Sequence, residues 1–173
     1  MKIERIGGKF SHHTYDIQPI RDLLKEEMTD KLSIDPFGTA GSPALVSNEF
    51  ANDRSACHNW DAITFLRLFD KSSVDGVLYN PPYSPAMIEA YYAGHGFKRP
   101  SSRHGWASLW YHCKNEIARI LKPGGKCISF GWNSTGCGEK RGFKLERILI
   151  VPHGQSRNDT ICTVETKIKR RNG

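Results

Sequence analysis

The residues Val74-Asp75-Gly76-Val77-Leu78-Tyr79, followed directly by Asn80-Pro81-Pro82-Tyr83, decide the fold. The first six are typical of a buried strand, because a short apolar run ends at residues that favour a turn. Two successive prolines hold the backbone rigid and remove two N–H donors. The sequence therefore predicts a strand over residues 74–79 that ends in a stiff, donor-poor corner at residues 80–83.

Helices and further strands are expected on both sides of this strand. Apolar residues at helical spacing predict three helices, over residues 18–29, 61–69 and 106–121. Short apolar runs predict strands at residues 32–34, near 47–52, and at 127–130, 144–151 and 160–168. This alternation predicts an α/β fold, in which helices cover both faces of a mostly parallel sheet and a C-terminal hairpin adds antiparallel strands at one edge.

The length and the N-terminus favour one domain. A chain of 173 residues fits a single domain with a buried core. Residues 1–14 are basic and lack periodicity, so we expect an N-terminal arm followed by one domain over 15–173. No apolar run approaches the roughly 20 residues of a membrane span, and no signal peptide follows Met1. We therefore expect a cytoplasmic protein.

The charge balance favours a polyanionic partner. The 25 Lys and Arg residues against 18 Asp and Glu residues give a net charge of +7, which nucleic acid explains most simply. A mildly basic protein without such a partner is the alternative. The five cysteines form no Cys-x-x-Cys pair and the histidines lack metal-ligand spacing, so neither a metal site nor a disulfide framework is predicted.

The corner at residues 80–83 carries the most specific chemistry. The side-chain amide of Asn80 and the carbonyl of Pro81 are fixed hydrogen-bond acceptors, and Tyr83 offers an aromatic face. Such a site suits an exocyclic amine on a planar base, with the nitrogen lone pair directed out of the ring plane. Positioning then supplies most of the rate, because the amine is a weak nucleophile. A Pro-Pro turn that merely ends the strand is the alternative.

The segment Leu78-Tyr79-Asn80-Pro81-Pro82-Tyr83-Ser84 resembles the catalytic motif of amino-group methyltransferases that use S-adenosylmethionine. Residues 33–41 resemble their cofactor loop, residues 116–132 their following helix, turn and strand, and residues 148–162 their terminal strands. The likeness covers roughly residues 15–168 and is greatest to small, often phage- or prophage-encoded adenine-specific DNA methyltransferases.

The resemblance implies a fold, an activity and a catalytic site. The fold would be the Rossmann-like methyltransferase fold with a seven-strand-type sheet. The activity would be methyl transfer from S-adenosylmethionine to the N6 amine of an adenine flipped out of DNA, without a metal and in a host cytoplasm if a phage encodes the protein. The catalytic residues would be Asn80, Pro81, Pro82 and Tyr83.

The resemblance also implies a set of cofactor-binding residues: Tyr15, Asp16, Asp35, Pro36, Phe37, Gly38, Gly41, Asp53, Asp61 and Ala62. Asp35 ends a predicted strand, and Gly38 and Gly41 let the backbone approach a ligand, here the methionine part of the cofactor. Thr39 stands where the family has a glycine, and only about ten residues separate Gly41 from Asp53, so the cofactor lobe is shortened. An ordinary turn capped by Asp35 is the alternative.

The other cofactor residues have ordinary structural alternatives. Asp53 would bind ribose hydroxyls, as in dinucleotide-binding folds, or lie in an exposed turn. Asp61 matches the family position that binds the adenine amine of the cofactor, or it is the N-cap of a helix over residues 62–69. Tyr15 and Asp16 resemble the element that closes over the methionine end, with a plain N-cap by Asp16 as the alternative.

A basic segment after the corner is the predicted DNA contact. Within the loop 84–105, the side chains of Lys98, Arg99, Arg103 and His104 are placed to contact phosphates and base edges. A solvated loop without a partner is the alternative. Because no separate target-recognition domain is present, we expect a short or loose target site, or a homodimer that completes the DNA-binding surface.

Two other functions stay open at this point. The altered cofactor loop also fits a weakly active or inactive methyltransferase-like subunit that binds nucleic acid. The Asn-Pro-Pro-Tyr motif does not by itself separate DNA adenine from RNA adenine or from glutamine in a protein. Residues 1–16 are too short for the additional N-terminal domain of the glutamine enzymes, and the basic charge also argues against them.

Overall fold

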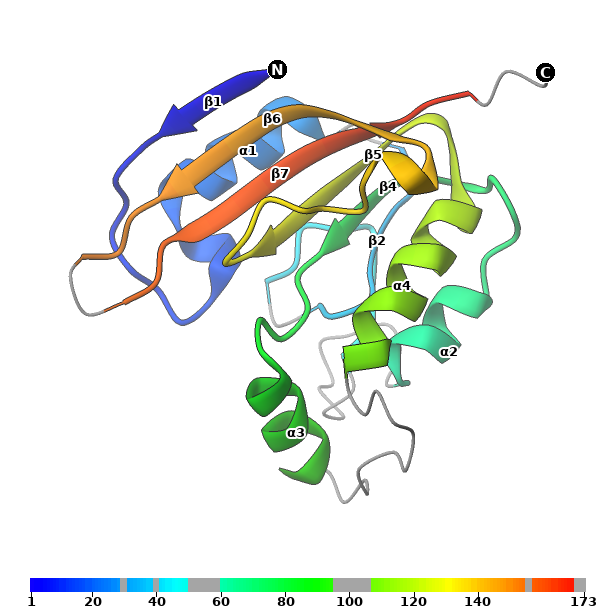
Figure 1. The fold of residues 1–173 in the computed structure, drawn as a ribbon, viewed down its shortest axis with the longest axis horizontal. Coiled ribbons are helices and arrows are strands. Elements are labelled where there is room, and N and C mark those ends of the chain that lie inside the picture. The colour runs from blue at the N-terminus through cyan, green and yellow to red at the C-terminus, as the bar shows by residue number, and fades with distance from the viewer. Residues whose placement is uncertain (29–30, 39–40, 50–59, 95–106, 155–156, 170–173) are drawn as a thin grey trace.

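The computed structural model describes residues 1–28, 31–38, 41–49, 60–94, 107–154 and 157–169, and Figure 1 shows how its elements are arranged. In chain order these elements are β1 (Lys2–Arg5), η1 (Thr14–Asp16), α1 (Gln18–Glu27), β2 (Ser33–Asp35), β3 (Val46–Ser47), α2 (Ala62–Arg67), β4 (Val74–Tyr79), α3 (Pro85–Gly94), α4 (Ala107–Ile120), β5 (Leu121–Gly131), η2 (Glu139–Arg141), β6 (Phe143–Val151) and β7 (Thr160–Lys167).

The strands of the described residues form one sheet in the order β1-β6-β7-β5-β4-β2-β3. Only β7 runs antiparallel to its neighbours, β5 and β6, and every other pair is parallel. This confirms the predicted Rossmann-like α/β fold with a mostly parallel sheet and an antiparallel C-terminal pair.

Strand β4 connects two hydrophobic cores. Val77 and Tyr79 belong to the core formed with α2 and α4, whereas Leu78 belongs to the core formed with α1. Successive side chains of a strand point to opposite faces, so both faces of the sheet are covered by helices, as predicted. Burial on both faces explains why β4 is a continuous apolar run rather than an alternating one.

Residues 2–5 differ from the prediction of an N-terminal arm. They form the edge strand β1, which pairs in parallel with β6. Three of its four side chains are exposed, so no apolar pattern identifies it in the sequence. Because β1 pairs with the outer side of β6, the C-terminal hairpin lies inside the sheet, and its predicted place at the edge is wrong.

Two other strands differ in length from their predictions. Strand β5 begins at Leu121, directly after α4, so residues 122–125 form an irregularity inside the strand rather than a separate turn. Gly124 has a φ of +85°, which glycine adopts without strain. Strand β3 has only two residues and ends before most of the predicted range 47–52.

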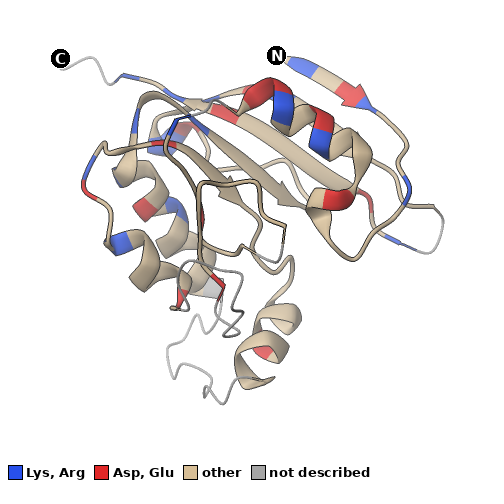
Figure 2. Cartoon of the chain, turned by 180° about the vertical axis from the view of Figure 1, so that it is seen from behind, with Lys and Arg blue, Asp and Glu red and all other residues tan. Residues whose placement is uncertain are grey.

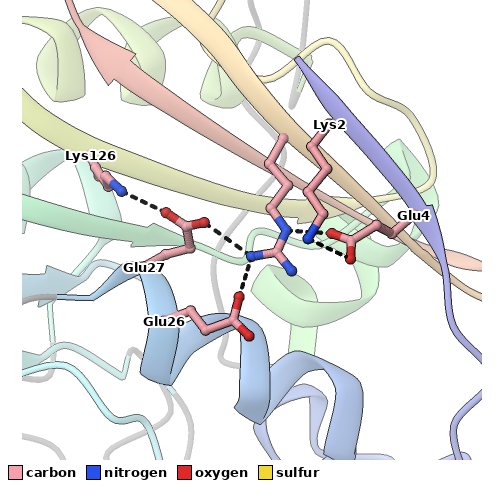
Figure 3. Close-up of polar contacts among 6 residues, drawn as sticks. Lys2, Glu4, Glu26, Glu27 and Lys126 are labelled. Atoms are coloured by element: carbon pink, nitrogen blue, oxygen red, sulfur yellow. Dashed lines mark hydrogen bonds and ion pairs between the residues drawn. The ribbon is translucent and has the colours of Figure 1, made fainter.

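Basic and acidic residues follow one another along α1, where Figure 2 shows blue and red segments of the ribbon side by side. Part of this surface joins α1 to the sheet through a network of six residues, drawn in Figure 3: Lys2, Glu4, Glu26, Glu27, Lys126 and Arg147. Arg147 on β6 is the centre of the network, and its side chain is only 11% exposed. It donates to Glu4 at 2.6 Å, to Glu26 at 2.5 Å and to Glu27 at 3.1 Å. The network therefore ties β1 and α1 to β6.

No helix within the described ranges is long and apolar enough to cross a membrane.

Candidate active site

The carboxyl ends of β2, β3 and β4 lie at one edge of the sheet, because these strands are parallel neighbours. A cavity of about 290 Å³ opens there, and its walls include Phe37, Glu49, Asn80 and Tyr91. Crevices at this edge are the usual ligand sites of open α/β sheets. The structure thus brings the corner at residues 80–83 next to Phe37 of the predicted cofactor loop.

The corner itself is held by two side-chain hydrogen bonds. The hydroxyl of Tyr83 donates to Oδ1 of Asn80 at 2.8 Å, and the indole N–H of Trp110 on α4 donates to the carbonyl of Pro82 at 3.0 Å. Burial raises the pKa of Tyr83 to about 12, so its hydroxyl remains a donor at neutral pH. These bonds and the two prolines leave Asn80 little freedom to move.

A second cavity, of about 300 Å³, lies on the other side of the corner at the end of β5. Residues 81–83 line both cavities. The walls of the second cavity also include Trp110, Lys114 and Trp132. The ring of Trp132 meets that of Tyr83 edge-on, with centroids 5.7 Å apart. The corner therefore lies between two cavities with aromatic walls, of which the first includes the carboxylate of Glu49 and the second the ammonium group of Lys114.

Asp35 holds the predicted cofactor loop together. Its carboxylate is fully buried and accepts hydrogen bonds from the hydroxyl of Tyr15 at 2.5 Å, the hydroxyl of Ser42 at 2.8 Å and the backbone N–H of Phe37 at 3.0 Å. Burial raises the pKa of Asp35 to about 6, although these hydrogen bonds act to lower it. Asp35 thus caps its own turn, and Tyr15 is brought to it from η1.

The raised pKa of Asp35 predicts a pH-dependent stability. The pKa of Asp35 is about 6 in the folded chain, against the ordinary value of 3.8 for an aspartate in an unfolded chain. The folded chain therefore binds the proton more tightly than the unfolded chain does. The free energy of unfolding falls as the pH rises between these two values. We expect Asp35→Asn to raise the free energy of unfolding at pH 8 by up to about 3 kcal/mol, since a buried charge is removed, and to have little effect near pH 4.

Urea unfolding of Asp35→Asn and wild type at acidic, intermediate and alkaline pH measures this difference. Asp70→Asn is the control, because it makes the same substitution at an exposed carboxylate. A difference between Asp35→Asn and wild type that stays constant across the pH range would contradict the assignment of the buried charge to Asp35.

Two buried polar residues after β3 belong to the site and were not predicted. The side chain of Asn48 donates to the carbonyls of Pro36 and Trp60, and it accepts from the N–H of Trp60. Its neighbour Glu49 is 7% exposed and accepts a hydrogen bond from the hydroxyl of Tyr91 on α3. Both residues fall within the strand predicted near 47–52. Their burial was not expected, because two adjacent polar residues without periodicity do not indicate a buried position.

The two glycines of the loop differ in their surroundings, and contact of either with the cofactor stays a prediction. A Cβ on Gly38 would lie 2.8 Å from Cβ of Ser47, so Gly38 allows the loop to pack against β3. Gly41 has a φ of +89° and open space around it. The close approach at Gly38 is thus to the protein itself, and only Gly41 leaves room for another group.

Asp61 is the N-cap of α2. Its Oδ1 accepts from the backbone N–H groups of Ile63 and Thr64, both at 3.1 Å. The structure thus confirms the predicted N-cap role of Asp61, whereas its contact with the adenine of the cofactor stays a prediction. Ala62, the other residue of this pair, is 2% exposed and packs in the core.

Substitution of Asp61 tests how much its N-cap stabilises the fold. We expect Asp61→Ala to lower the free energy of unfolding by about 1 kcal/mol, and Asp61→Ser to leave it nearly unchanged, because serine also caps helices. Thermal and urea unfolding measure both variants. Equal destabilisation by the two substitutions would show that the carboxylate does more for stability than cap the helix.

Asp16 does not cap a helix. It is exposed in η1, and the N-cap of α1 is Ile17, which makes no side-chain capping bond. The alternative interpretation of Asp16 is therefore wrong, because Pro19 and the apolar Ile17 already define the first turn. Its role in closing over the cofactor stays a prediction.

Five predicted residues lie outside the described part of the chain: Asp53, Lys98, Arg99, Arg103 and His104. The predicted DNA-contacting loop 84–105 begins with helix α3, whose ten residues span Pro85–Gly94. The remaining residues of that loop lie outside the described ranges.

Three solved structures share this fold. TrmN from Thermus thermophilus superposes with a TM-score of 0.59 at 17% identity, covering 88% of this chain and 49% of its own. The protein yhhF of Escherichia coli has a TM-score of 0.55 at 12% identity, covering 94% of this chain and 90% of its own. This chain thus spans about half the length of TrmN and most of the length of yhhF.

The third is 1,6-didemethyltoxoflavin-N1-methyltransferase from Burkholderia thailandensis, solved with 1,6-didemethyltoxoflavin and S-adenosylhomocysteine bound. Its TM-score is 0.52 at 11% identity, and the match covers 80% of this chain and 72% of that protein. No protein-family model and no curated protein sequence matches this chain. At these identities the likeness establishes the Rossmann-like fold.

Proposed function

We propose that this chain is an S-adenosylmethionine-dependent DNA methyltransferase that methylates the N6 amine of an adenine taken out of the duplex. The observation that carries the proposal is the rigid corner at residues 80–83, whose residues 81–83 line both of two cavities at the carboxyl ends of the strands. One cavity suits the cofactor and the other suits a planar base. The corner lies where the two would meet.

The first cavity has groups that fit S-adenosylmethionine. Glu49 offers a buried carboxylate for ribose hydroxyls, as acidic residues do in dinucleotide-binding folds, and Phe37 offers an aromatic face. Asp35 lies behind them and would favour the positive charge of the methionine end. Glu49 would thus do what the sequence suggested for Asp53, whose own contact with the ribose stays a prediction. When bound, the cofactor supplies an electrophilic methyl group on sulfur.

The second cavity has groups that fit a flipped base. Trp110 and Trp132 provide aromatic surfaces, and Lys114 provides a cation for the adjoining phosphate. The base amine would reach the corner where the two cavities meet, because Asn80 lines the first cavity and Pro81 lines both. There the amide oxygen of Asn80 and the carbonyl of Pro81 would accept the two hydrogens of the amine, and so direct its lone pair out of the ring plane. Solvent takes the proton released after transfer. The rate then comes mainly from position and orientation.

The choice of DNA as the acceptor is supported by charge. The net charge of +7 favours a polyanion, and the four basic residues predicted to contact DNA follow α3 in the sequence. The Burkholderia protein that shares the fold was solved with S-adenosylhomocysteine, which supports the choice of cofactor. A homodimer that completes the DNA-binding surface stays a prediction.

Transfer of a labelled methyl group from S-adenosylmethionine to DNA, RNA and protein tests the proposal. We expect the label to enter DNA and neither RNA nor protein. Label found only in RNA or only in a glutamine of a protein would overturn the choice of acceptor while keeping the methyltransferase. No label in any acceptor, with the cofactor bound, would overturn the activity itself.

A non-catalytic nucleic-acid-binding subunit is the second candidate. One observation favours it: the amide oxygen of Asn80 accepts a hydrogen bond from Tyr83, and the carboxylate of Asp35 already accepts three. Both groups are thus engaged within the protein. Calorimetry discriminates the two candidates, because a subunit of this kind would bind DNA but would show no binding of S-adenosylmethionine at millimolar concentration.

A further inference from the structure

Two cysteines and one glutamate form a buried cluster beneath the second cavity. Cys127 on β5, Cys137 in the loop before η2 and Glu165 on β7 place their sulfur and oxygen atoms within 4.8 Å of one another. Each of the three residues is at most 2% exposed. They are 10 and 28 positions apart in the sequence, unlike the short cysteine pairs that identify most zinc sites. Only the fold brings them together.

The sulfur atoms are spaced as two ligands of one metal ion. Sγ of Cys127 lies 3.6 Å from Sγ of Cys137. Two thiolates bound tetrahedrally to zinc, each with a bond of about 2.3 Å, are roughly 3.8 Å apart. A disulfide requires a separation of about 2.05 Å. A zinc ion therefore fits the observed spacing with little movement, whereas a disulfide needs the chain to shift.

The carboxylate of Glu165 is already oriented. It accepts hydrogen bonds from the backbone N–H of Cys137 at 2.6 Å and of Gly138 at 2.8 Å. Gly136 has a φ of +47°, and a side chain there would collide with the carboxylate, so the loop folds closely around it. Each carboxylate oxygen keeps a further lone pair for a metal, and hydrogen-bonded carboxylates are typical metal ligands.

Nearby groups complete the surroundings of a cation. The hydroxyl of Tyr79 is buried and has no hydrogen-bond partner among the described residues. Tyr79 packs in the same core cluster as Cys127 and Cys137. Its hydroxyl is therefore available to a water molecule held by a metal in the fourth position. Lys114 and Arg141 act electrostatically on Glu165 and offset the excess negative charge of two thiolates and a carboxylate.

We propose that Cys127, Cys137 and Glu165 bind one zinc ion, with a water molecule beside Tyr79 as the fourth ligand. Binding releases the thiol protons and fixes the loop of residues 132–138 to β5 and β7. That loop carries Trp132, which lies against Tyr83 of the corner. The site would thus hold one wall of the second cavity, and it does not depend on the proposed methyl transfer.

Metal analysis of the untagged chain tests the proposal. The protein is purified in reducing buffer, incubated with zinc, and separated from free metal before its zinc content is measured. We expect about one zinc ion per chain for wild type. The double variant Cys127→Ser, Cys137→Ser should retain none, while Cys162→Ser should retain it, because Cys162 is an equally buried thiol in the other core.

Cobalt gives a second measurement that does not require the double variant to fold. Wild type with Co²⁺ in place of zinc should show the sulfur-to-cobalt charge-transfer absorption of two thiolates, and Cys137→Ser about half of it. Glu165→Gln should weaken zinc binding by at least about tenfold, since loss of even a group that only orients a ligand has an effect of this size. A folded wild type that binds no zinc, an unchanged zinc content in the double variant, or a disulfide between the two cysteines would overturn the proposal.

Discussion

Asn80→Ala is expected to reduce methyl transfer at least about 100-fold, because removal of one preorganised hydrogen-bonding group from an active site has an effect of roughly this size. Asn80 lines the first cavity, next to residues 81–83, which line both cavities. Without its amide oxygen the amine of the base keeps one acceptor and loses its fixed orientation. The affinity for S-adenosylmethionine should change little. Transfer of labelled methyl groups and calorimetry measure the two effects separately.

Two further variants make this result specific. Asn80→Asp keeps an acceptor oxygen of the same shape and should retain more activity than Asn80→Ala. Asn158→Ala removes an exposed amide in the connection between β6 and β7 and should leave activity unchanged. Full activity in Asn80→Ala would remove Asn80 from the catalytic site. Equal loss in all three variants would indicate a general defect in folding.

Arg147→Met is expected to lower the free energy of unfolding by about 2–3 kcal/mol, because the partly buried carboxylates of Glu4 and Glu27 lose the guanidinium and keep only one cation each, Lys2 and Lys126. Arg147 donates to Glu4, Glu26 and Glu27, and so joins β1, α1 and β6. Methionine fills a similar volume, so the loss of charge pairing is the main change. Urea unfolding at neutral pH measures the effect.

The same network predicts how this difference depends on pH. Burial acts to raise the pKa of Glu27, but hydrogen bonds from Lys126 and Arg147 outweigh it, and the pKa is lowered. A lowered pKa stabilises the fold above the ordinary value of 4.5 and loses that effect as the pH falls below it. The difference between wild type and Arg147→Met should therefore shrink in acid.

Lys2→Met is the matched control for Arg147→Met. Lys2 belongs to the same network, but its side chain is 62% exposed, and exposed pairs contribute about 0–1 kcal/mol. An effect of Lys2→Met as large as that of Arg147→Met would show that simple net charge, rather than the buried guanidinium, determines the stability.

The sequence predicts those elements whose side chains are buried in a regular pattern. Strand β4, helix α4 and the pair β6 and β7 bury apolar residues at the period of a strand or a helix, and all were expected. Strand β1 was missed because its exposed residues contribute backbone pairing and a charged network rather than an apolar face. Glu4 of β1 pairs with Arg147, which lies 143 positions later in the sequence. Local sequence patterns do not predict contacts between residues so far apart.

The candidate site shows the same division. Asn80 and Asp35 were expected at strand ends, because an apolar run followed by a turn signals where a strand stops. Glu49 and Asn48 were not, since their burial depends on hydrogen bonds to Tyr91, Pro36 and Trp60. The close packing of Gly38 against Ser47 was not expected either. Contacts of this kind are set by tertiary packing.

The position of the transferred methyl group tests the central claim most directly. DNA labelled in the reaction is digested to nucleosides, and the labelled nucleoside is identified by mass spectrometry. A corner that holds an exocyclic amine by two acceptors predicts N6-methyladenine. Label on a ring carbon or a ring nitrogen, or label recovered from DNA whose adenines lack the 6-amino group, would contradict it.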